Sequence, residues 1–595
     1  MEVVIRVWWF IFVMTQSASC DIENHFIREY SPQLGQFIDD VIQCKNIPGL
    51  SLAIVQDGQV VMSAGYGKRD LEHQLPVDEN TVFPIGSLSK VFTAVTLANI
   101  LVDLTDLEWD TPLHNRLGDS FQLPGNFRTD EVCLRDLMAH KVGLEESFLL
   151  LVMDTNMTKQ EYVRRLQYFD EQYPFRSRFH YSNAMYTLAG HVAEIVTGDS
   201  YENLVRDKTL RPCSMKNSGF AAEISEDTNN FAVSYLWNST SGKYISLPKD
   251  LFRIVGLHSP AGGLVSNAVD MAQFMLRFLN TTMDSNAKEA YKEIVSPQFA
   301  LNGYSKQTRK FFPVADVETD YAMGLKNGIY RGYSRLSHSG WFAGFNSLLW
   351  FYPHKSTGIF TAINGPYTSE ADGALKRIHA YATDLLMGEE PWMNSSTACS
   401  YPLPWRPTPV KSTDTKQEFV IDTEDDEKMY LLDYVGSYLH PGFGHLSIYM
   451  GEDLSLRFTY GNFGRGTLSV TPLRDVFEIT IESPIWYLSA GVKIVFLRAN
   501  TAEVEKVQFP VEDACGFKQY YYKTCFRREH KSILTTRGYD QRHLPAYEKK
   551  VIGPGAALNA ILNLGTRSVT MRPNNHYAKN GDQLWTLSLI TILCT

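Results

Sequence analysis

Paired apolar runs at two places in the chain predict β-hairpins. Apolar residues fill most of 50–55 and 60–66, and Asp57-Gly58 lies between these two runs. Asp and Gly tolerate the positive φ of a tight hairpin turn, so this is a strong local signal. A second pair of apolar runs, at 346–352 and 358–364, flanks a short polar turn. We therefore expect strands near both ends of the first 390 residues.

The segment between the two hairpins is predicted to be mainly helical. Residues 87–101 are nearly all apolar at helical spacing, which indicates a buried helix that begins with Ser87 and carries Lys90 in its first turn. Helical patterns then continue to about residue 290. Strands at both ends with helices between them predict one antiparallel sheet packed against a helical region, an α/β (α+β) fold.

Strand-like alternation returns after residue 429. Alternating apolar positions at 446–450, 454–458, 477–481 and 492–496 predict a small antiparallel β-barrel or sandwich. The stretch before them is rich in proline and then in acidic residues, which is typical of an extended linker. The predicted divisions are a signal peptide at 1–20, a first domain at 21–395, a linker at 396–428, a β-barrel at 429–530 and an irregular tail at 531–595.

The first twenty residues predict secretion. Arg6 precedes an apolar run, and small residues follow before Cys20, as in a signal peptide. The alternative is a buried N-terminal helix, because the run is too short to span a bilayer. An apolar run at 584–593 is also too short, so we expect no membrane span. Candidate glycosylation sequons begin at Asn156, Asn238, Asn280 and Asn394.

Charge and cysteine content exclude several classes of function. The formal net charge is −10, and no stretch concentrates Lys and Arg, so nucleic acid is not an expected partner. The eight cysteines lack the spacing of metal ligands, and we expect neither a metal nor a cofactor. In an oxidising compartment some would form disulfides, and Cys515–Cys525 is the favoured local pair.

Ser87 and Lys90 form a Ser-x-x-Lys motif at the start of the predicted buried helix. A separation of three residues puts both side chains on one helix face. Apolar surroundings lower the pKa of a buried lysine, which makes Lys90 a candidate base for the Ser87 hydroxyl. Such a motif also occurs by chance on solvated helices, so it needs further support.

Two further motifs supply that support. In Tyr181-Ser182-Asn183, an extended backbone would send Tyr181 and Asn183 to one side while Ser182 turns away. In His338-Ser339-Gly340, the glycine would let a substrate lie against the backbone, with His338 and Ser339 as polar contacts. A histidine at such a place is otherwise often a satisfied core or surface residue.

In this order, the three motifs resemble the signature of the serine β-lactamase and penicillin-binding protein superfamily. Within it, the chain is similar to the secreted eukaryotic type that is related to class C β-lactamases and to peptidase family S12. The resemblance covers about residues 30–390. The flanking segments that also resemble this family are Pro48-Gly49-Leu50, Phe83-Pro84-Ile85-Gly86, Leu137-Met138-Ala139-His140, Phe179-His180, Gly262-Gly263-Leu264 and Gly340-Trp341-Phe342-Ala343-Gly344.

The resemblance implies an α/β/α sandwich with the active site between the sheet and the helical region. It further implies an acyl-enzyme on Ser87, with Lys90 and Tyr181 sharing general acid and base work. Asn183 would hold the substrate amide and Lys90. The oxyanion would lie between the backbone amides of Ser87 and Trp341.

Two departures from the family pattern, one weaker resemblance and one alternative complete the expectations. Lys141-Val142-Gly143 replaces the usual Thr-Ser-Gly after His140. His338 stands where β-lactamases have lysine, and a neutral imidazole holds a carboxylate less firmly, so the resemblance favours a peptidase or esterase acting on a small peptide, ester or amide. The segment from Tyr434 is similar to the lipocalin-like domain of some family-S12 peptidases. The alternative is a non-catalytic or matrix-associated extracellular protein on the same fold.

Overall fold

The computed structural model describes residues 30–529, except for 105, 119–120, 146, 155, 226, 239–240, 284–288, 302–310, 407–430, 483–484, 486–491, 500–502 and 513–523. The predicted signal peptide, the tail at 531–595 and Cys515 therefore lie outside the described residues. The chain divides after residue 529, and all the described residues belong to the first of the two units. None of the described helices is long and apolar enough to cross a bilayer.

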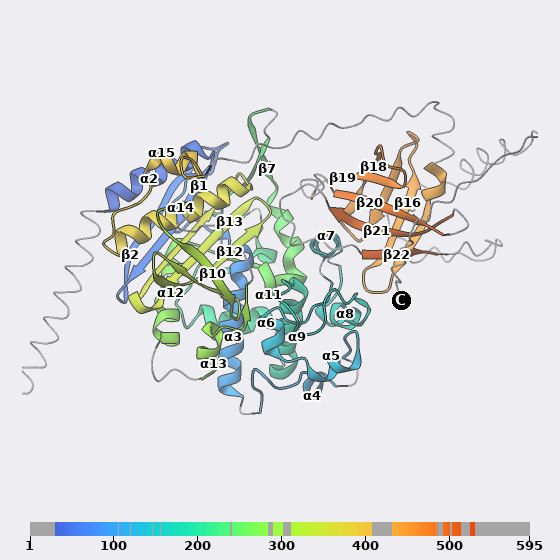
Figure 1. Cartoon of the computed structure of the whole chain (residues 1–595), viewed down its shortest axis with the longest axis horizontal. Coiled ribbons are helices and arrows are strands. Elements are labelled where there is room, and N and C mark those ends of the chain that lie inside the picture. Colours follow the sequence, from blue (N-terminus) through green and yellow to red (C-terminus); the bar gives the residue numbers. More distant parts are fainter. Residues whose placement is uncertain are drawn as a thin grey trace, which may run out of the picture. The chain divides into compact units, whose positions relative to one another are not determined.

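Both predicted hairpins are present in one nine-stranded sheet of order β3-β2-β1-β14-β13-β12-β11-β10-β9 (Figure 1). The turn of the first hairpin, at Asp57 and Gly58, has φ values of 49° and 80°, which is the positive φ that the sequence predicted. The strands are β1 (Gly49–Gln56), β2 (Gln59–Asp70), β3 (Leu75–Pro76), β9 (Phe299–Ala300), β10 (Asp316–Tyr321), β11 (Lys326–Tyr330), β12 (Tyr333–Phe342), β13 (Phe345–Tyr352) and β14 (Thr357–Ile363).

The two ends of the domain meet in the middle of this sheet. Strand β1 pairs antiparallel with β14, with Leu52 opposite Thr361. Strand β14 also pairs with β13, where Phe360 lies opposite Leu349. One antiparallel sheet is therefore assembled from segments some 300 residues apart, as the pattern of strands and helices predicted.

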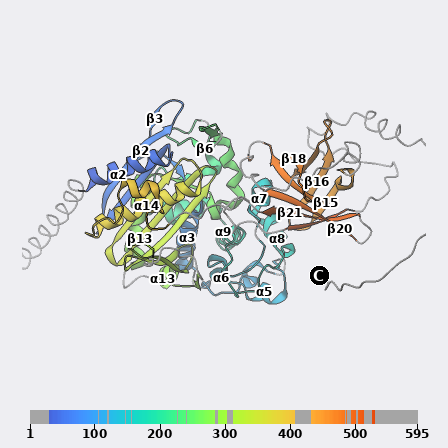
Figure 2. The same ribbon diagram turned by 45° about the horizontal axis from the view of Figure 1, so that its top comes forward.

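Helices cover both faces of the sheet (Figure 1, Figure 2). Side chains alternate along β1, so Leu52 and Ile54 belong to one core while Ala53 and Val55 belong to the other. The first core lies under α2 (Ser31–Cys44), α14 (Ser369–Leu386) and α15 (Ser395–Ser400). The second lies under the helical region, which includes α3 (Ser89–Asp103), α9 (Asn183–Thr197), α12 (Ala268–Met283) and α8 (Lys159–Arg165). The result is the expected α/β/α sandwich.

Short elements complete the helical region. The short helices are α4 (His114–Leu117), α5 (Asn126–Glu131), α6 (Leu134–Met138), α7 (Phe148–Met153), α10 (Tyr201–Val205), α11 (Ser259–Gly262) and α13 (Glu289–Val295). The 3-10 and π turns in this domain are η1 (Gly86–Leu88), η2 (Leu166–Tyr168), η3 (Arg206–Leu210), η4 (Ala221–Glu223), η5 (Lys249–His258) and η6 (Pro353–Lys355). The small strands are β4 (Phe83–Pro84), β5 (Gly219–Phe220), β6 (Ser234–Asn238), β7 (Lys243–Leu247) and β8 (Leu264–Ser266).

The chain remains packed on the first domain beyond the predicted linker boundary at 396. Cys399 in α15 forms a disulfide with Cys44 at the end of α2. Tyr401 stacks on Phe312 with ring centroids 5.6 Å apart. The prolines that suggested an extended linker therefore begin inside a packed aromatic cluster. Sequence periodicity missed this because neither the disulfide partner nor Phe312 is near in sequence.

The C-terminal prediction of a small antiparallel barrel is confirmed. Eight strands close into a barrel in chain order, each paired antiparallel with its neighbours. They are β15 (Gly436–His440), β16 (Gly444–Met450), β17 (Leu456–Tyr460), β18 (Gly464–Val470), β19 (Val476–Ile481), β20 (Val492–Arg498), β21 (Val504–Glu512) and β22 (Thr524–Arg528), preceded by η7 (Leu432–Tyr434). Barrel residues also contact the helical region, since Phe443 stacks on Phe169 at 4.5 Å.

Candidate active site

Ser87 lies on the turn that leads into the buried helix α3. It belongs to the 3-10 turn η1, whereas the sequence predicted that the helix itself would begin there. Leu88, Val91 and Phe92 are fully buried and fix this turn in the core. Ser87 is partly exposed, whereas Lys90 is completely buried. The hydroxyl is therefore accessible to solvent, while the amine beside it is not.

The amine of Lys90 bonds three oxygens at once. Its Nζ lies 3.1 Å from Ser87 Oγ, 2.8 Å from Asn183 Oδ1 and 2.8 Å from the Ala261 carbonyl oxygen. It also lies 4.7 Å from the centroid of the Tyr181 ring. The Ser-x-x-Lys and Tyr-x-Asn motifs, far apart in sequence, therefore meet at one nitrogen.

The Tyr181-Ser182-Asn183 segment leads directly into helix α9. Ser182 is the N-cap, with extended backbone angles, and its Oγ accepts a hydrogen bond from Met185 N at 3.4 Å. Ser182 thus turns away from Lys90, as expected. Asn183 is already the first helical residue, where the sequence suggested an extended backbone, but its amide oxygen still reaches Lys90.

A buried histidine lies beneath Tyr181. The rings of His140 and Tyr181 are 4.3 Å apart, and Ser182 N donates a hydrogen bond to His140 Nδ1 at 3.0 Å. Burial, with nearby Lys90, holds the pKa of His140 well below its usual value, so the imidazole is neutral. The sequence marked His140 as part of a recognisable segment but gave it no role, because its neighbours are distant along the chain.

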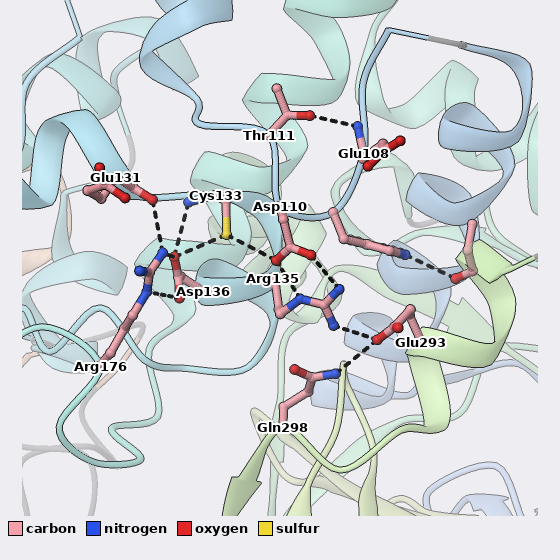
Figure 3. A network of polar contacts seen from close by, with 12 residues as sticks. Glu108, Asp110, Thr111, Glu131, Cys133, Arg135, Asp136, Arg176, Glu293 and Gln298 are labelled. Atoms are coloured by element: carbon pink, nitrogen blue, oxygen red, sulfur yellow. Dashed lines mark hydrogen bonds and ion pairs between the residues drawn. The ribbon is translucent and has the colours of Figure 1, made fainter.

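An ion pair anchors the segment that leads to Tyr181 (Figure 3). Arg176 donates from Nε and Nη2 to the Asp136 carboxylate, at 2.9 and 2.7 Å. Asp136 is buried at the start of α6 and also accepts from Cys133 N. Arg135, on the same helix, bonds Asp110 and Glu293. Helix α6 is thereby tied both to the Tyr181 segment and to α13.

Two glycines bring strand β12 against the serine turn. Gly86 has a φ of 52°, and a Cβ added there would lie 2.7 Å from Trp341 N. A Cβ on Gly340 would lie only 2.0 Å from the Ile85 carbonyl oxygen. These separations are too short for any side chain, so both positions require glycine. The backbones that carry the predicted oxyanion amides, those of Ser87 and Trp341, are neighbours for this reason.

The side chains of His338 and Ser339 point to opposite faces of β12. His338 is buried on the face of the helical region, with Nε2 3.2 Å from Tyr321 Oη and Nδ1 2.7 Å from the Ser339 carbonyl oxygen. Burial lowers its pKa to about 3, with a further contribution from nearby Lys90. Ser339 pairs with Leu348, whose side chain belongs to the opposite core. Tyr321, which sequence reasoning missed, thus packs with His338 and His140 in one buried cluster of rings.

The predicted glycosylation sites differ in exposure. Asn156, Asn280 and Asn394 are exposed, and Asn238 is half-buried in β6. The Asn394 side chain also accepts from Thr397 N as the N-cap of α15.

Among the described residues, one group could supply three metal ligands: Glu145, Asp170 and His440. His440 Nδ1 already accepts hydrogen bonds from Gly442 N and Phe443 N, at 3.0 and 3.2 Å. The neutral ring then carries its proton on Nε2, the nitrogen that would have to bind an ion. This group therefore gives no ready metal site, and it involves none of the predicted catalytic side chains.

Comparisons with known proteins agree with this geometry. The β-lactamase family model matches residues 34–383. An unguisins hydrolase of Aspergillus campestris is 25% identical over 433 residues, covering 69% of this chain and 76% of that protein. Gigasin-6 of Magallana gigas is 25% identical over 229 residues, covering 38% and 75%.

A solved structure supports the same fold. The octameric penicillin-binding protein homologue from Pyrococcus abyssi has a TM-score of 0.51 at 20% identity, covering 84% of this chain and 100% of that one. At this identity the likeness concerns the fold alone. The family match, in contrast, spans well over half of the 595 residues and contains every residue of the three motifs. The chain belongs to the β-lactamase family of serine hydrolases.

Proposed function

We propose that this protein is a secreted serine hydrolase, of the family-S12 peptidase type, that forms an acyl-enzyme on Ser87. The observation that carries the proposal is the 3.1 Å contact between the partly exposed Ser87 hydroxyl and the fully buried Lys90 amine. A serine hydroxyl needs a base to become a nucleophile, and a buried amine three residues along a helix can serve as one.

Proton transfer would run through Lys90 and Tyr181. Lys90 in its neutral form takes the proton of Ser87 as Oγ attacks the substrate carbonyl carbon. The resulting oxyanion is stabilised by the backbone N–H groups of Ser87 and Trp341. The pair Lys90 and Tyr181 returns the proton to the leaving group, and water then attacks the acyl-enzyme by the reverse path. Asn183 orients the lysine and contacts the substrate amide.

The site favours small peptide, ester or amide substrates. His338 occupies the position of the substrate-binding lysine in β-lactamases, and its pKa of about 3 leaves it uncharged. A neutral ring with both nitrogens engaged offers no charge to a substrate carboxylate. A relative that is 25% identical is named as a hydrolase of unguisins, which supports hydrolase activity for this chain.

Two features support secretion. Residues 1–20 have the composition of a signal peptide. The disulfide between Cys44 and Cys399 is of the kind that persists in oxidising compartments. Expression in a eukaryotic secretory host should yield a mature chain lacking this leader, with sugar on one or more of the exposed sequons, as read by mass spectrometry.

A fluorophosphonate probe followed by peptide mapping tests the proposed nucleophile. The folded protein should be labelled on Ser87 alone. Labelling should disappear in Ser87→Ala and fall strongly in Lys90→Met, whereas Ser334→Ala, at an exposed position on β12, should label normally. If the folded wild type resists the probe and hydrolyses no ester or peptide in a broad panel, the enzyme proposal is wrong. The non-catalytic, matrix-associated role would then replace it.

A further inference from the structure

A polar cavity of about 440 Å³ lies on the face of the sheet opposite Lys90. Strands β12 and β13 form one wall, through Ser337 and its cross-strand partner Trp350, and helix α14 forms the other through Arg377. Trp350 belongs to the core on the α14 side, whereas His338, between Ser337 and Ser339, faces the helical region. The cavity and the Ser87 site are therefore on opposite sides of one strand.

Charged side chains line this cavity, and most are neutralised in pairs. The pairs are Arg335 with Asp316 at 2.7 Å, Lys326 with Glu318 at 3.0 Å and Lys376 with Asp372 at 3.1 Å. Each pair holds one positive and one negative group, so none of them leaves net charge in the cavity. What remains is the fourth cation of the lining, Arg377.

Arg377 is not compensated in this way. Its side chain is only 5% exposed, and the nearest carboxylate oxygen in the described part of the chain, on Glu370, is 4.0 Å away. Glu370 is exposed and is bound more closely by Lys45, at 3.1 Å. Arg377 Nη2 donates to the Glu370 carbonyl oxygen at 3.2 Å, but Nε is buried with no hydrogen-bond partner among the described residues. A buried guanidinium N–H without an acceptor is costly, since the desolvation of the donor is not repaid.

Aromatic rings supply the apolar part of the same cavity. Tyr401 lies 5.2 Å from the Arg377 guanidinium carbon, and Trp350 lies 4.2 Å from that of Arg335. Trp392 and Met393 also line it. Rings with a few fixed polar groups are the usual lining of a small-molecule site.

We propose that this cavity binds a small aromatic carboxylate, whose carboxylate pairs with the guanidinium of Arg377 and whose ring lies against Trp350 and Trp392. The carboxylate would supply the negative charge that the Arg377 side chain lacks within 4.0 Å. A guanidinium is planar and offers parallel donors, which suits a carboxylate better than a single-atom anion. The site does not involve Ser87, Lys90 or Tyr181, so it stands independently of the proposed catalytic function.

Calorimetric titration of the full-length Ser87→Ala protein with phenylacetate tests this site, with phenylacetamide as the uncharged control ligand. Phenylacetate should bind, and phenylacetamide should bind at least 10-fold more weakly. Arg377→Gln should weaken phenylacetate binding at least 10-fold. The matched variant Arg211→Gln, at a highly exposed arginine, should bind phenylacetate as the parent does.

Two further measurements keep the outcome decisive. Phenylacetate binding should persist in wild-type protein whose Ser87 is already blocked by the fluorophosphonate. If Arg377→Gln does not fold, Ser337→Leu fills the cavity from β12 with the charges left in place, and it should also abolish binding. No binding of phenylacetate, equal binding by Arg377→Gln or by a folded Ser337→Leu protein, or loss of binding when Ser87 is blocked would each overturn the proposal.

Discussion

The backbones of Gly86 and Trp341 approach so closely that a Cβ on Gly86 would lie 2.7 Å from Trp341 N and 2.8 Å from Trp341 O. This contact joins the turn before Ser87 to strand β12, two segments that are 255 positions apart in the sequence. Catalysis by backbone donors requires such a fixed separation, because the donors must already face the place where charge develops.

Gly86→Ala is therefore expected to reduce hydrolysis by at least 10-fold. The new methyl group would push β12 away from the serine turn and separate the two amides that we propose as oxyanion donors. Gly58→Ala is the matched control, because Gly58 also has a positive φ but has no atom within 4 Å of an added Cβ. It should cost about 1 kcal/mol of stability and leave turnover unchanged. Equal activity losses in the two variants would contradict the role of the close contact.

Asn183 is expected to set the pH at which Lys90 can act as a base. Asn183→Asp places a carboxylate at the 2.8 Å contact with Nζ, which favours the ammonium. The acid limb of the rate profile should then move to higher pH, by about one unit or more. Asn183→Ala removes the hydrogen bond from Lys90 Nζ, which is worth about 2 kcal/mol, and should therefore lower kcat about 30-fold. Asn115→Asp, at an exposed position, is the control and should leave the profile in place.

The disulfide between Cys44 and Cys399 is expected to stabilise the first domain. It links residues separated by 355 positions, and closing a long loop restricts the unfolded chain strongly. Reduction should lower the free energy of unfolding by about 2–5 kcal/mol. Dithiothreitol should therefore lower the Tm of the wild type but have little effect on a Cys44→Ser/Cys399→Ser variant, whose Tm is already low. An equal effect of the reductant on both proteins would contradict this assignment.

Buried histidines are expected to destabilise the protein in mild acid. Burial lowers the pKa of His258 and His338 to about 3 and that of His180 to about 4. The unfolded chain, with pKa values near 6.5, then binds more protons than the folded one between about pH 6.5 and 4. Stability is full above this window and is lost as pH falls through it, at about 2 kcal/mol per histidine at pH 5.

Denaturant unfolding at pH 7.5, 6.0 and 5.0 measures this dependence. His258→Gln should flatten it by the share of one histidine, whereas His354→Gln, at an exposed position, should not. Carboxylates with lowered pKa values, such as that of Glu194 at about 2, titrate below this window. The raised pKa of Asp384, about 6, works against the histidines within it, but one carboxylate offsets only part of the effect of several histidines. A free energy of unfolding that stays constant from pH 7.5 to 5.0 would contradict the prediction.

The sequence by itself determined the local elements and pointed to the groups that we propose to react. Asp57-Gly58 predicts the first hairpin because both residues tolerate positive φ, and the alternation after residue 429 predicts barrel strands. Ser87 and Lys90 are placed together by helical spacing alone, which is a local property of the chain. The resemblance of the three motifs to one family then predicted the sandwich that the structure has.

Only the tertiary structure decided what surrounds these groups. The contact of Asn183 with Lys90, the neutral His140 under Tyr181 and the burial of His338 against Tyr321 all join segments far apart in the chain. The packing of residues 396–406 on the first domain was likewise hidden, because Cys399 and Tyr401 find their partners more than 80 positions away. Periodicity predicts which face of a helix or strand is apolar. It does not predict which side chain of another layer packs on that face, and the pKa and the role of a buried group depend on that neighbour.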